Sequence, residues 1–298
     1  MARRSTAGAV ARGTATSFRS PKNKNARFAS RPHPFALLNR RRVEDETMTT
    51  FSGRSAIVIG AGAGVGRATA LALSAEGARV WAVGRDAARL EALRNAATGG
   101  PVEPRAFDAT DAGAMGRLID EAEPSLVVLS AGMRPRVAPI VEHTWESFSE
   151  PWNTDLKMAF HLGQAALRRP LRPGSVVVIV SSGAGLGGSP LSGGYAGAKR
   201  MQMFLASYFQ GASDAEKLGI RFVALAPKQL IAGTDIGSAA ANGYAARLGI
   251  TAEQYMERFG APLTPKDVAK TILDIARGEV GVGSTVLGLS SKSGLEAL

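Results

Sequence analysis

Three side chains in the second half of the chain have types and spacing suited to acid–base chemistry on a carbonyl group. Tyr195 and Lys199 are four residues apart, and Ser182 lies thirteen residues before Tyr195. Positions i and i+4 of a helix share a face, so the Tyr195 phenol would lie beside the Lys199 ammonium, which favours the phenolate form. Ser182 follows an apolar stretch, where its hydroxyl could bind the same carbonyl oxygen. The three residues therefore predict proton transfer between Tyr195 and a carbonyl or alcohol oxygen.

Short apolar segments alternate with helix-like segments from residue 48 onward, and they must position these side chains. Such alternation predicts βαβ units and hence an α/β fold with a single Rossmann-type doubly wound parallel sheet, covered by helices on both faces. The carboxyl ends of parallel strands share one edge, where ligands bind in such sheets. The expected strands are 56–59, 79–83, 104–107, 126–129, 175–180 and 221–226.

A glycine-rich loop follows the first expected strand. Gly60, Gly64 and Gly66 have the spacing Gly-x-x-x-Gly-x-Gly, with Val65 between the last two. Glycine permits a tight turn and lets the backbone approach a pyrophosphate, and a helix that begins near Gly66 would offer free N–H groups. A flexible Gly/Ala loop is the alternative, but the position between a strand and a helix favours a dinucleotide site.

The residues after the second expected strand indicate which dinucleotide is bound. Proteins that prefer NAD usually place an acidic residue here, whereas this chain has Gly84 followed by Arg85. A guanidinium suits the 2′-phosphate of NADP, so we expect NADP(H), with NAD as the alternative. A solvated Arg85 in a turn is the simpler interpretation, and Asp86 could pair with Arg85 or face the ribose.

With these motifs in view, residues 52–290 resemble the short-chain dehydrogenase/reductase family. The resemblance rests on the order of the signals, because the glycine loop comes first and Ser182, Tyr195 and Lys199 follow at the family's spacing. It implies an NAD(P)-dependent enzyme that interconverts a carbonyl and an alcohol, with Lys199 also contacting the nicotinamide ribose. It further implies cofactor contacts at Asp108, Ala109, Ser130, Ala131, Gly132, Tyr195, Pro227 and Thr234.

Several positions depart from the family pattern, among them Ser130 in place of asparagine and Lys228 in place of glycine. The departure with the largest consequence is Asp155, which stands where an asparagine normally holds a water near the lysine. On a regular helix, Asn153 points elsewhere. If Asp155 faces the site it joins the catalytic set, and Lys199 is its expected partner because a buried carboxylate needs an opposite charge. A helix cap or a surface residue is the alternative.

An Ala-rich insertion at residues 230–262 interrupts the alternation of strands and helices. Insertions at this place commonly cover a pocket at the carboxyl edge of the sheet. The Gly- and Ala-rich stretch 183–194 would line the same pocket, which favours a largely apolar or bulky carbonyl compound. The apolar contacts expected from the lid are Ile231, Tyr244, Tyr255, Met256 and Phe259.

The same residues also bear on an alternative function and on the oligomeric state. An NADP(H)-binding sensor or scaffold with little catalysis is the alternative function, although the intact Ser182, Tyr195 and Lys199 count against it. The family commonly pairs the helices at 152–167 and 195–209 across subunits, so we expect a homodimer or homotetramer. The alternative is that the apolar residues of these helices face the protein's own core.

Composition limits the remaining possibilities. The 298 residues contain no cysteine and three histidines that form no cluster, so no metal centre is expected. No apolar run approaches the roughly 20 residues of a membrane-spanning helix. Residues 1–47 hold nine Arg and two Lys against three acidic residues, which leaves +3 of the net charge of +11 for the rest of the chain.

The basic segment 1–47 is expected to be disordered, since it is rich in Arg, Ser and Thr and has few residues that could form a core. We favour an upstream extension, with Met48 as the working start and a cytoplasmic location. An Arg-rich transit peptide, which would place the protein in an organelle matrix, is the alternative. A nucleic-acid-binding arm is a weaker third interpretation, and the charge distribution argues against nucleic acid as a partner of the domain.

Overall fold

The computed structural model describes residues 51–298, and the expectations for the segment 1–47 lie outside this part. Eight strands form one sheet in the order β3-β2-β1-β4-β5-β6-β7-β8. Strands β1 to β7 are parallel, and β8 runs antiparallel to β7. The strands are β1 (Ser55–Ile59), β2 (Arg79–Gly84), β3 (Val102–Ala106), β4 (Leu126–Leu129), β5 (Val176–Val180), β6 (Arg221–Pro227), β7 (Val286–Ser290) and β8 (Gly294–Ala297).

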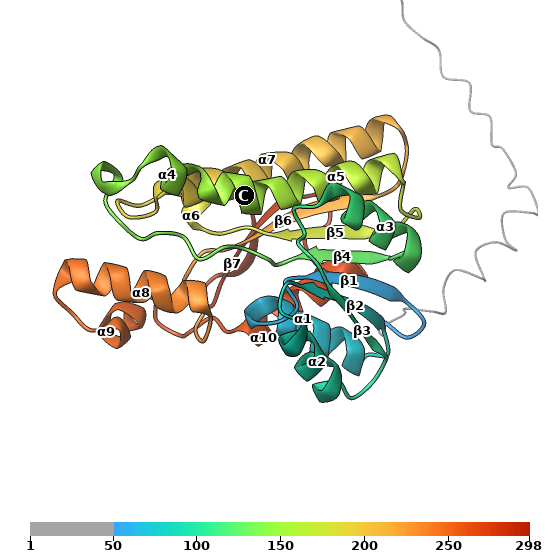
Figure 1. The fold of residues 1–298 in the computed structure, drawn as a ribbon, viewed down its shortest axis with the longest axis horizontal. Helices are drawn as coiled ribbons and strands as arrows, with labels where there is room; N and C mark the ends of the chain where they lie inside the picture. The colour runs from blue at the N-terminus through green and yellow to red at the C-terminus, as the bar shows by residue number, and fades with distance from the viewer. Residues whose placement is uncertain (1–50) are drawn as a thin grey trace, which may run out of the picture. The chain divides into compact units, whose positions relative to one another are not determined.

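The predicted doubly wound α/β fold is confirmed by helices on both faces of this sheet (Figure 1). Because both faces are covered, β4 and β5 are uninterrupted runs of buried aliphatic residues. One face carries α1 (Gly64–Ala75), α2 (Ala87–Ala96) and α10 (Pro265–Arg277). The other carries α3 (Ala112–Ala122), α5 (Lys157–Arg168) and α7 (Gly193–Ala215).

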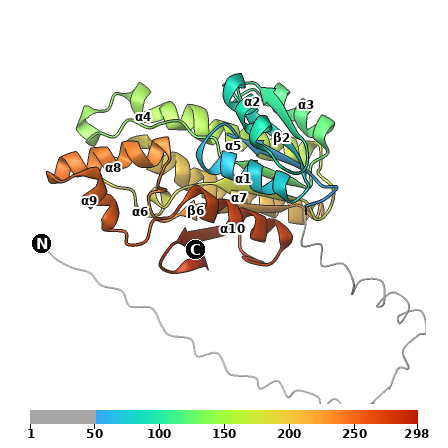
Figure 2. The same ribbon diagram turned by 90° about the horizontal axis from the view of Figure 1, so that it is seen from below.

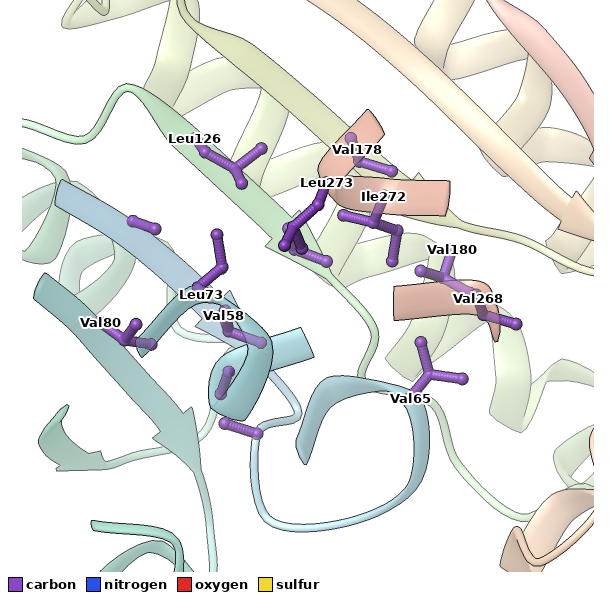
Figure 3. Packing of buried hydrophobic residues seen from close by; sticks show 14 of the residues in the cluster. Val58, Val65, Leu73, Val80, Leu126, Val178, Val180, Val268, Ile272 and Leu273 are labelled. Atoms are coloured by element: carbon purple, nitrogen blue, oxygen red, sulfur yellow. The ribbon is translucent and has the colours of Figure 1, made fainter. Parts of the chain in front are cut away.

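Each face of the sheet has its own hydrophobic core, because successive side chains of a strand point to opposite sides. On the α1 and α10 side, Val58 packs with Leu73 of α1 and Ile272 of α10 (Figure 3). On the other side, Ile57 belongs to the cluster that contains Phe209 of α7. Strand β1 is therefore fixed from both sides, and so is the start of the loop that follows it.

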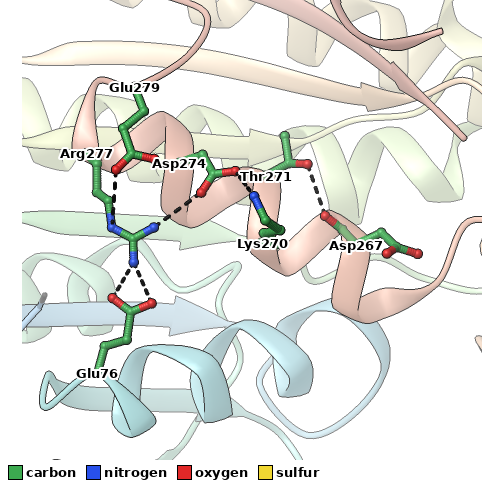
Figure 4. Close-up of polar contacts among 7 residues, drawn as sticks. All are labelled: Glu76, Asp267, Lys270, Thr271, Asp274, Arg277 and Glu279. Atoms are coloured by element: carbon green, nitrogen blue, oxygen red, sulfur yellow. Dashed lines mark hydrogen bonds and ion pairs between the residues drawn. The ribbon is translucent and has the colours of Figure 1, made fainter. Parts of the chain in front are cut away.

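An ion-pair network joins α10 to the end of α1 (Figure 4). The Arg277 guanidinium contacts the Glu76 carboxylate that follows α1, and its Nη1 lies 3.2 Å from Asp274 Oδ1. The Arg277 side chain is only 14% exposed, so these contacts are partly shielded from water. They hold the carboxyl end of α1, whose opposite end points towards the cavity described below.

The remaining helices follow the carboxyl ends of the strands. In Figures 1 and 2, α8 and α9 project from the same end of the molecule as α4 and α6. Helices α8 and α9 belong to the predicted lid at residues 230–262. The elements are η3 (Ile140–Glu142), α4 (Trp145–Pro151), η4 (Trp152–Leu156), α6 (Ala184–Gly187), α8 (Asp235–Leu248) and α9 (Ala252–Glu257).

The two ends of the lid lie side by side. Ile231 and Leu263 form a parallel β-bridge, and the Ala232 N–H donates to the Leu263 carbonyl at 2.9 Å. Gln229 Nε2 donates to the Ala261 carbonyl at 2.9 Å. The first and last residues of the lid are therefore held next to each other.

The turn between β7 and β8 closes this point. Gln229 Oε1 accepts hydrogen bonds from the backbone N–H and the hydroxyl of Ser291, each at 2.9 Å. The Ser291 hydroxyl also lies 2.6 Å from the Ala261 carbonyl. We call Gln229, Ala261 and Ser291 the lid clip. Strands β7 and β8, which the strand prediction omitted, thus take part in anchoring the lid.

Within residues 51–298, no helix is long and apolar enough to cross a membrane.

Candidate active site

A cavity of about 760 Å³ lies where the loops after the parallel strands meet. Its volume is within the range of about 300–1,000 Å³ that is typical of small-molecule sites. Every site residue expected from the sequence lines this cavity except Gly66 and Asp155. The expected residues on its wall are Gly60, Gly64, Val65, Arg85, Asp108, Ala109, Ser130, Ala131, Gly132, Ser182, Tyr195, Lys199, Pro227 and Thr234.

Two glycines of the loop after β1 allow close contacts of the backbone, Gly60 with the loop after β4 and Gly66 with Gly60. Gly60 has φ +87°, and a Cβ there would lie 2.5 Å from the Ala131 nitrogen. A Cβ at Gly66 would lie 2.2 Å from the Gly60 carbonyl oxygen. Gly66 is therefore required for the packing of α1 against the loop, and it does not form the cavity wall.

The first helix begins at the cavity without a side-chain cap. Helices α2 and α3 begin differently, because Asp86 and Asp111 accept hydrogen bonds from their first N–H groups. Gly64 and Val65, the first residues of α1, line the cavity. Uncapped N–H groups and the positive end of the helix dipole together suit an anionic group such as a pyrophosphate. The residues present here therefore fit a dinucleotide.

Arg85 lines the cavity just beyond β2, as does its neighbour Asp86. Asp86 accepts a hydrogen bond from the Arg89 N–H at 3.1 Å, and its Oδ2 lies 3.3 Å from Arg89 Nε. Asp86 thus caps α2 and pairs with Arg89 rather than with Arg85. Arg89 also lines the cavity, and the sequence analysis missed it. The sequence signal that could have found Arg89 is its position three residues after the helix cap Asp86, a spacing at which the two side chains can pair.

Asp108 borders the same end of the cavity after β3. Its Oδ1 accepts hydrogen bonds from the N–H and the hydroxyl of Thr110, each at 2.9 Å. These two hydrogen bonds lower the pKa of Asp108, burial opposes them slightly, and the Arg85 charge adds to the lowering. Asp108 is therefore an anion that holds its own turn, and it lies within electrostatic reach of Arg85.

Tyr195 and Lys199 project from the first turns of α7 onto the cavity wall. Lys199 Nζ lies 5.5 Å from the centre of the Tyr195 ring, as the i, i+4 spacing predicts. The Ser181 hydroxyl donates to the Lys199 carbonyl at 2.8 Å and so ties α7 to the end of β5. Ser182 lines the cavity beside this contact, and its Oγ accepts a hydrogen bond from the Ala184 N–H at 3.2 Å. All three predicted side chains thus meet at one cavity.

Asp155 lies behind Lys199 and has no exposed surface. Its Oδ2 is 3.1 Å from Lys199 Nζ, and its Oδ1 accepts a hydrogen bond from the Met133 N–H at 2.8 Å. Burial alone would lower the pKa of Lys199, but the Asp155 carboxylate and then Tyr195 outweigh it and raise that pKa. Lys199 is therefore held as a cation at neutral pH.

A π-helical turn, η4, changes which residues of this segment face the cavity. The Lys157 N–H reaches the Trp152 carbonyl, five residues back. This wider turn places Asn153 and Thr154 on the cavity wall and Asp155 in the interior. The expectation that Asn153 points elsewhere was wrong, because it assumed a regular helix. Such turns are common near functional sites.

The last residue of β6, Pro227, and Lys228 and Thr234 after it lie on the wall. The Lys228 ammonium forms an ion pair with Glu296 of β8. Thr234 caps α8 by accepting a hydrogen bond from the Gly237 N–H at 3.1 Å. Lysine at the place of the family's glycine thus has its charge partner in the last strand.

The lid supplies aromatic and aliphatic side chains to the far end of the cavity. Four of the five apolar lid residues expected from the sequence line it, and Met256 does not. Those on the wall are Ile231, Tyr244, Tyr255 and Phe259.

Comparison with known proteins identifies the family. Residues 54–242 match the family described as short chain dehydrogenase, and the chain belongs to that family. Two solved structures share its fold. A levodione reductase gives a TM-score of 0.69 at 21% identity, over 80% of this chain and 97% of that one. A xylitol dehydrogenase bound to NAD+ gives a TM-score of 0.69 at 19% identity, over 80% and 98%.

Curated relatives match over a shorter stretch. A D-erythrulose reductase from Gallus gallus is 34% identical over 135 residues, which is 44% of this chain and 54% of that protein. A carbonyl reductase [NADPH] from Sus scrofa is 34% identical over 134 residues, 44% and 54% of the two chains. The L-xylulose reductase of Homo sapiens is 32% identical over 133 residues, with the same coverage. The chain thus spans about half the length of these relatives.

Proposed function

We propose that the protein is an NADP(H)-dependent oxidoreductase that interconverts a carbonyl and an alcohol on a small molecule. The observation that carries this proposal is that a helix start suited to a dinucleotide and the three polar residues line the same cavity. The uncapped start of α1 opens at one end, and Ser182, Tyr195 and Lys199 lie on the same wall. When bound, the dinucleotide would supply hydride chemistry, with NADPH oxidised to NADP+ as a ketone becomes an alcohol. The names of the curated reductases agree with this reaction class.

The roles of the three polar residues follow from their surroundings. Ser182 holds the carbonyl oxygen by donating a hydrogen bond to it, since its own oxygen already accepts from the Ala184 N–H. Tyr195 gives its proton to that oxygen as the carbonyl becomes an alcohol. The buried Lys199 ammonium stabilises the phenolate that remains, because opposite charges attract strongly where water is excluded. Asp155 keeps Lys199 charged and in place.

The preference for NADP over NAD rests on the residues after β2. Gly84 offers no carboxylate, and Asp86 is engaged in the α2 cap and the Arg89 pair. Arg85 and Arg89 both line this end of the cavity, and a guanidinium binds a phosphate through two parallel hydrogen bonds. Gly60, Gly64 and Val65 would hold the pyrophosphate, and Asp108 and Ala109 would border the adenine.

A dinucleotide sensor with little catalysis is supported less well. It needs the cofactor end of the cavity alone, whereas this chain also keeps a proton donor and a buried cation beside it. Lys228, which departs from the family pattern, has its charge paired with Glu296.

We also propose that the protein forms a homodimer or homotetramer through α5 and α7. Phe160 on α5 and Phe204 on α7 are each 42% exposed, and Tyr208 is 62% exposed. Phe204 and Tyr208 stack with ring centres 6.3 Å apart, which makes an apolar surface along α7. Met203 is buried, so only part of the apolar content of α7 serves the protein's own core.

The test of the proposed function is a dinucleotide-linked assay of the full chain with a panel of ketones and alcohols. We expect oxidation of NADPH with at least one ketone. A Tyr195→Phe variant should lose turnover by about 10²-fold or more, because the proton donor is absent. The same variant should bind NADPH normally in a fluorescence titration. Turnover that survives the loss of the Tyr195 hydroxyl would refute the assigned role, and NADPH binding without any turnover would favour the sensor.

A further inference from the structure

The lid closes the substrate end of the cavity with a layer of aromatic rings. Tyr244 of α8 and Tyr255 of α9 stack with ring centres 5.4 Å apart and planes inclined by 12°. Phe259 meets Tyr255 edge to face at 5.6 Å and 75°. All three residues line the cavity and are partly buried. Tyr255 thus contacts both other rings, and the three rings pack as one layer.

Three of the hydroxyl groups at this end, those of Ser189, Ser192 and Tyr244, are hydrogen-bonded within the protein. Ser189 Oγ is hydrogen-bonded to the Tyr244 hydroxyl. The Ser189 N–H donates to Ser192 Oγ at 2.8 Å, and that hydroxyl donates to the Ser189 carbonyl at 2.9 Å. A ligand that carries many hydroxyl groups would lose its water here and compete with these internal hydrogen bonds, which weakens binding.

Besides the rings, this wall carries the polar residues Gln229 and Asp235 as well as aliphatic side chains. Lys228 lines the cavity, but its ammonium is paired with Glu296. Burial, and then the neighbouring Tyr244, raise the pKa of Tyr255 against a smaller effect of Arg258, so this phenol stays neutral at physiological pH. Aliphatic side chains complete the wall: Met133, Val137, Leu191, Ile231 and Ile236.

We propose that the substrate is an uncharged ketone, or the corresponding alcohol, that carries a flat unsaturated ring. This inference rests on the function proposed above and assigns its substrate class. The ring packs against the Tyr255–Phe259 layer, where offset and edge-to-face contacts favour a second aromatic group over a saturated one. The carbonyl lies towards Ser182 and Tyr195. A sugar ketone of the kind named for the curated relatives would fit this wall poorly.

The test compares three ketones in the NADPH-linked assay of the full chain. Acetophenone has a flat ring, cyclohexyl methyl ketone has a saturated ring of the same carbon number, and L-xylulose is a polyhydroxylated ketone. We expect kcat/KM for acetophenone to exceed that for cyclohexyl methyl ketone by about tenfold. L-xylulose should be the poorest of the three. Equal values for the two ring ketones, or a preference for L-xylulose, would overturn the inference.

Two substitutions of Tyr255 test whether the lid causes the preference for acetophenone. Tyr255→Leu should reduce the preference for acetophenone to about twofold or less, because the ring layer is interrupted. Tyr255→Phe keeps the ring and should keep the preference, which makes it the matched control. A preference that persists in Tyr255→Leu would show that the lid does not select the ring.

Binding measurements separate this inference from the proposed function. Isothermal titration calorimetry with 1-phenylethanol and 1-cyclohexylethanol, in the presence of NADPH, which cannot accept a hydride from them, reports selection without turnover. Tighter binding of the aromatic alcohol, lost in Tyr255→Leu, would support the substrate class even if no ketone in the set is reduced. Turnover of L-xylulose with no aromatic preference would support the function and refute the class.

Discussion

Lys199 and Asp155 form an ion pair that is shut off from water. Nζ and Oδ2 are 3.1 Å apart, and the two side chains are 4% and 0% exposed. The second carboxylate oxygen of Asp155 accepts the Met133 N–H of the loop after β4. The pair therefore connects α7, η4 and a loop on the cavity wall, and both charges depend on each other.

Removal of the Asp155 carboxylate should destabilise the fold. Asp155→Ala leaves Lys199 as a buried charge without its partner, so the free energy of unfolding should fall by about 3–5 kcal/mol at pH 7. Urea denaturation measures the change. Glu121→Ala removes one partner of the exposed Arg105 pair and should cost less than about 1 kcal/mol. A similarly small decrease in the free energy of unfolding in both variants would contradict a stabilising role of the buried Lys199–Asp155 pair.

The same pair sets the pH range of its own contribution to stability. The pKa of Lys199 is raised in the folded state, so the folded chain binds this proton more tightly than the unfolded chain does. The contribution is complete below the ordinary lysine pKa of about 10.4 and is lost as pH rises through the folded value. Denaturation midpoints at neutral and at alkaline pH should therefore show the Asp155→Ala penalty shrinking only at the alkaline end.

Asp155→Asn should shift the alkaline limit of activity to lower pH. The amide keeps the shape of the side chain but not its charge, so burial then lowers the pKa of Lys199 with only Tyr195 acting against it. We expect activity near neutral pH and an earlier loss above it, by about one pH unit or more. The pH profile of kcat/KM measures this. An equal decrease at every pH would indicate a purely structural role, and Asp120→Asn, on the surface of α3, serves as the control.

Arg85→Ala should change the choice between dinucleotides. Loss of a charged hydrogen bond to the 2′-phosphate should reduce the NADPH/NADH ratio of kcat/KM by about 10- to 100-fold, through weaker NADPH binding. Kinetics with both dinucleotides and fluorescence titrations without substrate test this. Arg79→Ala, at the exposed start of β2, removes the same charge away from the cavity wall. An unchanged ratio in Arg85→Ala would exclude Arg85 as the residue that reads the phosphate.

Gln229→Ala should loosen the lid without loosening the sheet. Gln229 makes three of the hydrogen bonds of the lid clip, so amide hydrogen exchange across residues 230–262 should accelerate by about tenfold. Exchange in β4 and β5 should not change. Ser293→Ala alters the same β7–β8 turn but not the clip, and it should leave exchange in the lid as it was. Faster exchange in both variants would assign the effect to the turn.

The sequence was sufficient for the architecture because buried parallel strands are short aliphatic runs. The six expected strands correspond to β1–β6 with shifts of one or two residues at their ends. Strands β7 and β8 were not predicted, since Gly288 and Gly294 and the serines around them resemble a loop. Their pairing depends on tertiary contact with β6, which no local pattern records.

The site was predictable where spacing alone fixes geometry, as for Tyr195 and Lys199. It was not predictable where one hydrogen bond changes the register of a helix. The π-helical turn rotates Asn153 onto the cavity wall, and a regular periodicity cannot anticipate it. The cofactor and catalytic roles assigned to individual residues stay predictions until the variants above are measured.

The parallel bridge between Ile231 and Leu263 separates the lid from the part of the chain that holds the proton-handling residues. Because the lid departs and rejoins at neighbouring positions, its length and sequence can change without moving any strand. The residues that handle the proton lie outside it, on α7 and after β5. We therefore expect that exchanging residues 235–262, which follow the expected cofactor contact Thr234, for those of another family member changes the choice of substrate while the proton-handling residues stay in place.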